Sequence, residues 1–302
     1  GQSTFFTGTS CLFRTATLKT HPFSDCITED TDLSYDMVLR RERILHLADQ
    51  GTREEVAPDF FSYIARRRRW SNGHNRTFFG HLWRIVASCP GFGTRIKLLL
   101  HGAFYLLPLL ILVILFSQAI FQWLQFNRDA RIVSAILTAI AASLLFFKVA
   151  RVYRNWVVDL LVSFLWFFPQ VVLIVPYVLK VFKPDLFFAL VMFPYMKELL
   201  WVQLGFVLIP LLLMLSGLRF FRYFNVFQTV KLIVTYPVIV FLDIYAALLG
   251  LTDCIFGKNV WARVKRTHKK DEVIHRRFAT PKSLAVTVAV LGVLPVSLLL
   301  LN

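Results

Sequence analysis

The chain has 302 residues, of which 57% are hydrophobic, 15% aromatic and only 17% charged. This composition excludes an ordinary soluble protein and predicts an integral membrane protein with at most one soluble portion. The net charge of +16 would suit a nucleic-acid partner. However, the basic residues cluster beside long apolar runs, where they orient membrane proteins. We therefore expect membrane lipids as partners, and no nucleic acid.

Residues 1–75 form the predicted soluble part. In STFFTGTSCLFRTATL, β-branched and aromatic residues surround Gly8, a pattern typical of a strand and a turn. In DTDLSYDMVLRRERIL, apolar residues recur near helical spacing, which predicts a helix after Asp30. The four cysteines show neither CxxC spacing nor histidines at metal-ligand spacing, so we expect reduced thiols.

Residues 76–97 are predicted to form an amphipathic helix in the plane of the membrane interface. One face gathers apolar side chains, and its flanks carry residues placed to reach lipid headgroups. The apolar face comprises Phe78, Phe79, Leu82, Trp83 and Val86, and the flanks comprise Arg76, His81 and Arg84. The same pattern also fits an ordinary amphipathic helix packed on a protein core.

Long apolar runs predict a transmembrane region over 98–251, with four to five spans, and a final transmembrane helix at 284–302. The candidate spans are 98–125, 132–150, 156–182, 199–217, 231–251 and 284–301. Between the last two lies a basic loop, 252–283. The positive-inside rule assigns this loop and residues 1–97 to the cytosol.

The number of spans raises a question of parity. Two cytosolic segments are separated by an even number of crossings, yet five candidates lie between them. One candidate must therefore lie in the membrane plane, re-enter or be a misjudged pair. The first suspect is 156–182, because Asp159, Pro169 and Pro176 interrupt it. Ionisable residues inside apolar runs, such as Asp159, usually face a protein-lined or wet path.

Three motifs occur in order in the soluble part: FFTGTSCLFR at 5–14, TEDTDLSYDMVLRR at 28–41 and RRRRW at 66–70. Their order, before an interfacial helix and several spans, resembles the membrane-embedded family 2 glycosyltransferases, which include cellulose, hyaluronan and glucan synthases. The resemblance covers the first hundred residues, and beyond them only the general layout matches. It implies an α/β fold, the C-terminal half of a GT-A-type glycosyltransferase domain, followed by an α-helical multi-span membrane domain.

The resemblance assigns catalysis to the second motif. An inverting transfer needs a carboxylate that takes the proton from the acceptor hydroxyl as this hydroxyl attacks the anomeric carbon. In the family, the aspartate of a T-E-D motif has that role. Here it falls on Asp30 within Thr28-Glu29-Asp30, so Asp30 is the expected general base. Taken alone, Glu29, Asp30 and Asp32 also fit the acidic first turn of a helix, where they complement its dipole.

The third motif resembles the family's Q-x-x-R-W, whose first position is arginine in some glucan synthases and is Arg66 here. The resemblance implies that Arg66 and Arg69 bind the donor diphosphate, whose oxygens suit a planar guanidinium. It also implies that Trp70 packs against the acceptor sugar. An interfacial anchor is the alternative role for Trp70. We expect Arg67 and Arg68 to be solvated charges or topology determinants.

Two more segments receive roles from the resemblance. FFTGT resembles the F-F-C-G-S segment near the acceptor in cellulose synthases, which implies acceptor contacts at Thr7, Gly8 and Thr9; a plain strand and turn is the alternative. The loop 258–277 corresponds to the family's gating loop, although the usual spacing is not met. Its expected phosphate contacts are Trp261, Arg263, Lys265, Arg266 and Thr267. A plain positive-inside loop explains these residues equally well.

Asp30-Thr31-Asp32 also has the D-x-D form that holds a nucleotide and a metal in this fold. Only 29 residues precede Asp30, too few for a nucleotide-binding α/β half. We therefore expect no metal site within this chain. Mg²⁺ or Mn²⁺ would bind mainly in an upstream half that this chain lacks, and the chain alone is expected to be inactive.

Together the motifs predict an inverting hexosyltransferase in a bacterial inner membrane. It would extend a β-linked polysaccharide from a nucleotide sugar, a UDP-hexose, and pass the polymer across the membrane. Arg66 favours a glucan. One alternative is a membrane glycosyltransferase that acts on a lipid or short acceptor without translocation. Another, from a different class, is a transporter or scaffold with a basic cytosolic cap.

Overall fold

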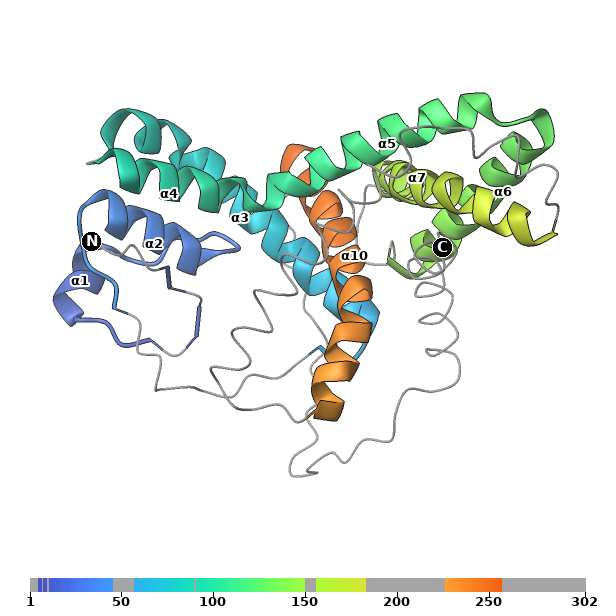
Figure 1. The fold of residues 1–302 in the computed structure, drawn as a ribbon. Coiled ribbons are helices and arrows are strands. Elements are labelled where there is room, and N and C mark those ends of the chain that lie inside the picture. Colours follow the sequence, from blue (N-terminus) through green and yellow to red (C-terminus); the bar gives the residue numbers. More distant parts are fainter. Residues whose placement is uncertain are drawn as a thin grey trace. The chain divides into compact units, whose positions relative to one another are not determined.

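The computed structural model describes residues 5–6, 8–9, 11–45, 57–89, 91–149, 156–182 and 226–256. Every regular element in this part of the chain is a helix (Figure 1). In chain order they are α1 (Thr15–Thr20), α2 (Glu29–Leu39), α3 (Phe60–Ser88), α4 (Phe92–Gly102), the 3-10 helix η1 (Ala103–Leu106), α5 (Leu107–Gln125), α6 (Arg128–Val149), α7 (Trp156–Phe182) and α10 (Val226–Phe256).

The predicted α/β half-domain is wrong for the described residues, because they contain no β-strand. The aromatic residues near Gly8 pack on helices and do not extend into a paired strand. The Phe6 amide donates to Ser34 Oγ at 2.9 Å, and the Phe5 ring stacks on His101 with centroids 3.6 Å apart. A strand needs a neighbouring strand to satisfy its backbone groups. The Phe6 amide instead binds the side chain of Ser34 in α2.

Helix α2 confirms the helix expected near Asp30. It begins at Glu29, and its first turn carries three carboxylates that favour the positive end of the helix dipole. The buried face of α2 includes the apolar side chains of Leu33, Met37 and Val38.

Helix α3 runs without a break through the arginine run and the segment predicted to lie in the membrane interface. It begins after Asp59, whose carboxylate caps it by accepting from the Ser62 amide at 2.8 Å. The predicted boundary between residues 75 and 76 therefore falls inside one helix. Helix α4 packs back on α3, and Gly102 lets the Phe78 ring lie so close that a Cβ on Gly102 would overlap it.

The described residues fall into two compact units, and long helices contribute to both. The first unit lies within 1–114, 143–163 and 245–268, and the second within 115–142, 164–244 and 269–302. The core of the first unit contains Tyr35, Val38, Phe78, Ile85, Cys89 and Leu98. The core of the second contains Ala119, Phe126, Ala130, Phe168, Val172 and Val175. Aromatic rings dominate the packing of the second core, as in the pair Trp123 and Phe168, with centroids 6.0 Å apart.

Four helical stretches of the described chain are long and apolar enough to cross a membrane, as expected of a membrane protein. They are Phe92–Gln125, Arg128–Phe146, Trp156–Val175 and Thr235–Phe256. They match four of the six predicted spans. The candidates 199–217 and 284–301 lie outside the described residues. Helix α7 continues through Pro169 and Pro176, so the suspected interruption of 156–182 does not break it.

The contact between Gly102 and Phe78 gives a test of this packing. We expect Gly102→Ala to lower the free energy of unfolding by about 1–3 kcal/mol, because the added methyl group overpacks a tight site. The matched control is Gly93→Ala in the same helix, where a Cβ meets no atom within 4 Å. The control should be neutral or slightly stabilising, by up to about 1 kcal/mol. Denaturant unfolding of both variants in detergent measures this, and equal effects would contradict the packing.

Candidate functional site

The first and second motifs meet at Asp30, in the first turn of α2. Gly8 has φ +81°, and a Cβ built on it would lie 2.9 Å from Asp30 Oδ2. The other oxygen of Asp30 accepts the Thr31 amide at 2.7 Å. Because Gly8 combines a left-handed backbone with this close approach, a side chain at that position would be strained and would crowd the carboxylate. Thr9 lies next to Gly8 and is exposed.

The second motif is also packed against α3, which carries the third. The Thr28 hydroxyl lies 3.1 Å from the Thr77 hydroxyl, and both side chains are buried. A Cβ on Gly73 would lie 2.5 Å from Thr28 Cγ2 and 3.1 Å from Ile27 Cβ. Gly73 therefore lets the segment before Asp30 rest directly on the α3 backbone.

Helical spacing places the third motif on the same face of α3. Trp70 precedes Gly73 by three residues and Thr77 by seven, so the three lie along one side of the helix. The guanidinium groups of Arg66 and Arg67 lie over the Trp70 ring, 5.1 and 5.4 Å from its centroid. An aromatic surface and two cations thus occur together, a combination suited to a ligand that carries both sugar and phosphate.

His74 is a site residue that the motifs did not indicate. It is buried, and its Nε2 donates to the His101 carbonyl oxygen at 3.0 Å. Burial lowers the pKa of His74, although the nearby charge of Asp30 acts in the opposite direction. The imidazole of His74 is therefore predominantly neutral at pH 7. Its position four residues after Trp70, on the same face of α3, was the available signal in the sequence.

Arg68 differs from the expectation of a solvated charge, because its side chain is fully buried. Its Nη1 and Nη2 donate to Asp159 of α7 at 2.8 and 2.7 Å, and its Nε and Nη2 donate to the carboxylate of Asp253 in α10. Burial alone would lower the pKa of Arg68, but these two carboxylates outweigh it and raise the pKa. Asp159 thus has a buried protein partner, as expected for an ionisable residue in an apolar run.

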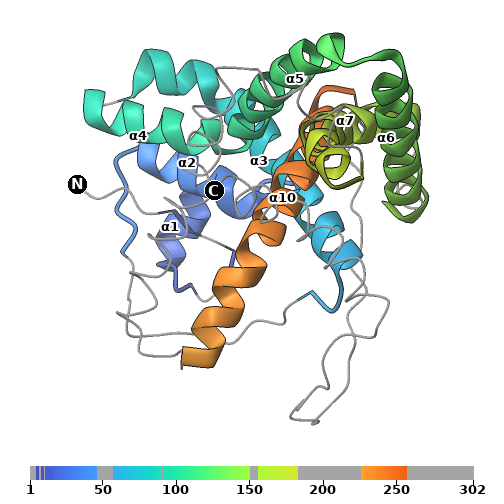
Figure 2. The ribbon, with the colours of Figure 1, turned by 45° about the vertical axis from the view of Figure 1, so that its right-hand side comes forward.

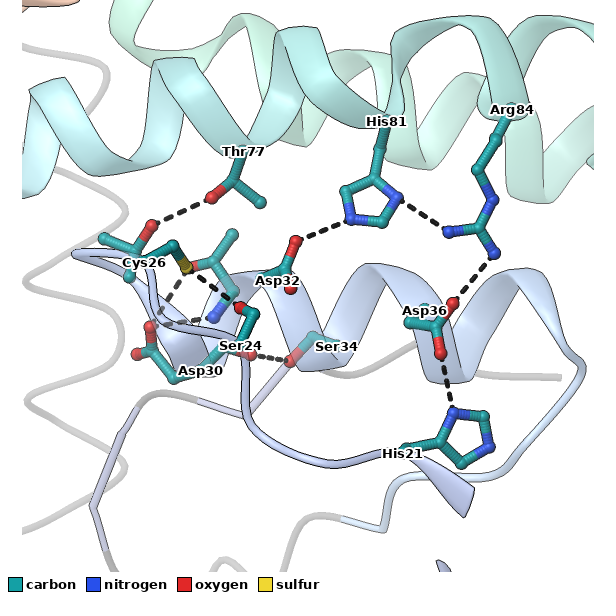
Figure 3. Close-up of polar contacts among 12 residues, drawn as sticks. His21, Ser24, Cys26, Asp30, Asp32, Ser34, Asp36, Thr77, His81 and Arg84 are labelled. Carbon is teal, nitrogen blue, oxygen red and sulfur yellow. Dashed lines mark hydrogen bonds and ion pairs between the residues drawn. The ribbon is translucent and has the colours of Figure 1, made fainter. Parts of the chain in front are cut away.

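A row of polar contacts joins α2 to α3 beyond Thr28 (Figure 3). His81 Nε2 donates to Asp32 Oδ1 at 2.7 Å, and Arg84 donates to Asp36 Oδ1 at 2.8 Å. The hydrogen bond from His81 is the main cause that lowers the pKa of Asp32. His81 and Arg84 were expected to reach lipid headgroups, whereas here they bind carboxylates of α2.

A polar pocket of about 360 Å³ lies between the start of α2 and α3. Its lining comprises Cys26, Ile27, Asp32, Gly73, Arg76, Thr77, Gly80 and His81. Gly80 borders open space, since a Cβ there would meet no atom within 4 Å. The pocket presents a guanidinium, a carboxylate and a hydroxyl, so it offers both donors and acceptors to a polar ligand.

Several predicted site residues lie outside the described part of the chain. They are Thr7 in the first motif and Trp261, Arg263, Lys265, Arg266 and Thr267 in the proposed gating loop. Their roles stay predictions. The described residues contain no group of three or more His, Cys, Asp or Glu side chains able to hold a metal ion. We therefore derive no step through the expected Mg²⁺ or Mn²⁺.

Comparison of the chain with protein-family models, with curated proteins and with solved structures gave no match. The family resemblance thus rests on the three motifs, and the roles of Asp30, Arg66, Arg69 and Trp70 stay predictions.

The contacts of Asp36 predict a dependence of stability on pH. Burial would raise the pKa of Asp36, but hydrogen bonds from Arg84 and His21, together with the charges of Arg40 and Arg84, lower it to about 2. A lowered pKa contributes stability that is complete above the pKa of an unfolded aspartate, about 3.9. This contribution is lost as the pH falls toward 2.

Thermal unfolding midpoints of the solubilised chain, measured from pH 5 to pH 2, test this expectation. Asp36→Asn should lower the midpoint at pH 5 and flatten its fall on acidification. Asp25→Asn, at an exposed position, should keep the dependence of the unchanged chain. If Asp36→Asn and the unchanged chain fall in parallel, the ion pairs of Asp36 do not stabilise the fold.

Proposed function

We propose that the protein is a membrane-bound inverting glycosyltransferase that transfers a hexose from a UDP-hexose to a growing β-linked polysaccharide. The observation that carries the proposal is the meeting of Gly8 with Asp30, on a helix that rests through Thr28 on the helix of Arg69 and Trp70. The first and second motifs thus meet at one carboxylate, and the third lies on the helix against which the second packs. A convergent constellation is stronger support for a catalytic role than any single motif.

Asp30 would act as the general base. The acceptor hydroxyl attacks the anomeric carbon of the donor sugar and gives its proton to a carboxylate oxygen of Asp30. The bond from that carbon to the diphosphate oxygen breaks, the nucleoside diphosphate leaves with the electron pair, and the configuration inverts. Asp30 Oδ2 faces Gly8, where any side chain would crowd the carboxylate.

The arginines and the indole supply binding. Arg66 and Arg69 would hold the diphosphate, where charge develops as the bond to the sugar breaks. Trp70 would pack against the apolar face of the acceptor. The cations over its ring favour a site in which sugar and phosphate lie close together. Asp30 itself lies in the first turn of α2.

Passage of the polymer across a bacterial inner membrane is the second part of the proposal. The second unit buries polar atoms for which the described residues provide no hydrogen-bond partner: the side-chain oxygens of Gln118 and Gln122 and the indole nitrogens of Trp123 and Trp166. Such atoms are costly in an apolar interior unless a ligand or water binds them. Amide oxygens and indole N–H groups complement sugar hydroxyls. The same atoms would also serve a transporter of another polar solute.

Replacement of the base tests the reaction. In the full-length protein in membranes, Asp30→Asn should lower the transfer of radiolabelled hexose from UDP-hexose by about 10²–10⁴-fold, because an amide cannot take the proton. Asp25→Asn, which is exposed and conservative in the same way, should retain full activity. Both variants must unfold at the temperature of the unchanged protein. Full activity of a folded Asp30→Asn variant would remove Asp30 as the base.

The product distinguishes the alternatives. A long polymer inside or beyond the membrane supports synthesis with translocation, whereas one hexose on a lipid supports the non-translocating alternative. If no UDP-hexose is consumed and reconstituted vesicles take up a solute instead, the transporter alternative is favoured.

A further inference from the structure

We propose that Arg68 is a positioning residue: clamped by Asp159 and Asp253, it sets the rotation of α3 and so the direction in which Arg69 and Trp70 face. This inference rests on the proposed function, because Arg69 and Trp70 are substrate-binding residues only there. The set Arg68, Asp159 and Asp253 is called the arginine clamp below. All three residues belong to the first unit.

The geometry of the clamp fixes the guanidinium plane. Nε and Nη2 bind one carboxylate side-on, and Nη1 and Nη2 bind the other end-on, so two edges of the group are held by two different helices. Arg68 has no exposed surface, and Asp159 and Asp253 are 3% and 7% exposed. A planar fork held at two edges cannot turn without breaking a pair of hydrogen bonds. A lysine ammonium is a point charge and could not hold this orientation.

The backbone of α3 is held at the same place. The Ser71 hydroxyl donates to the Ala247 carbonyl oxygen at 2.9 Å, and a Cβ on Gly250 would overlap the Arg68 carbonyl oxygen. Small residues let α3 and α10 approach closely, as in the helix contacts of membrane proteins. Both ribbon views show the two helices side by side here (Figures 1 and 2). The clamp therefore acts on a helix that is already close to its partner.

The clamp and the site lie on opposite sides of α3. Successive residues turn by about 100° around a helix, so Trp70 lies about 200° from Arg68, roughly opposite it. Trp70 shares its side with Thr77, which binds Thr28, whereas Arg68 shares its side with Ser71. Rotation of α3 about its axis would thus move Trp70 sideways past the segment that carries Asp30. The arginine clamp opposes that rotation from the side of α3 opposite Trp70.

The charges around the arginine clamp balance one another. Two carboxylates surround one guanidinium, which leaves one negative charge in excess. Arg76 is placed two turns further along α3, and its Nη2 donates to the Asp253 carbonyl oxygen at 3.3 Å. The two arginines and the two aspartates together are neutral, so the buried group needs no additional ion.

Two changes to the clamp test the proposal in the full-length protein. Arg68→Lys keeps the charge but not the fork. The triple variant Arg68→Met, Asp159→Asn and Asp253→Asn removes the three charges of the clamp, while the half-buried Arg76 keeps its hydrogen bond to the backbone carbonyl of residue 253. Arg40→Met serves as the control, because its pair with Asp36 is a half-exposed contact within α2. Thermal unfolding shows which variants are folded, and only folded protein is compared.

With radiolabelled UDP-glucose as donor, both clamp variants should lower kcat by about 10- to 100-fold, because the reacting groups are misaligned. The KM for the donor should rise as well, because Arg69 is retained but no longer faces the diphosphate in the same way. Arg40→Met should change neither value. An unchanged kcat in a folded triple variant would overturn the proposal, as would a loss that only follows the folded fraction.

A second measurement does not depend on activity. In a background whose native cysteines are replaced by serine, Thr28→Cys with Thr77→Cys should form a disulfide, because the two hydroxyls lie 3.1 Å apart. Adding Arg68→Lys should slow its formation about threefold or more, since disulfide geometry tolerates little displacement. An unchanged rate would overturn the clamp. If the unchanged protein uses no UDP-hexose but the rate of disulfide formation falls, the proposed function fails and the clamp stands as a feature that orients α3.

Discussion

Burial of one guanidinium in α3 is the constraint on which the first unit depends. A charge without solvent must be matched by hydrogen-bonded counter-charges, and Arg68 finds them on two helices far away in sequence. These carboxylates lie within apolar stretches that would otherwise exclude them. The guanidinium and the two carboxylates therefore offset one another's cost of burial. The pairing also joins α3 to α7 and α10, because both buried carboxylates accept hydrogen bonds from the same guanidinium.

Three glycines allow the close backbone contacts of the first unit. Gly250 brings α10 to the backbone of Arg68, and Gly73 brings the start of α2 to the opposite side of the same helix. Gly8 then brings the N-terminal segment to Asp30. Helix α3 therefore contacts α10 on one side and, on the other, the start of α2, which carries the proposed catalytic carboxylate. Where a contact is made by backbone without an intervening side chain, a small displacement of one helix is transmitted directly to the next.

The sequence predicted the helices better than it predicted the N-terminal fold or the partners of charged residues. Periodicity and hydropathy located α2 and four spans, because both signals are local. The expected α/β half-domain failed at residues 5–9, where β-branched and aromatic composition does not show whether a second strand exists. Arg68 was expected in solvent, since nothing local distinguishes it from Arg67. Its partners lie 91 and 185 positions away, a relation that no local pattern contains.

Helical periodicity explains why four consecutive arginines reach different surroundings. At about 100° per residue, neighbours in the run point to different sides of the helix. Arg66 and Arg67 lie four and three residues before Trp70 and reach over its ring, while Arg68 is fully buried. The third arginine of the run is the one that reaches the two carboxylates. The position of Arg68 relative to Trp70 is therefore a structural feature of α3, and not only a contribution of positive charge.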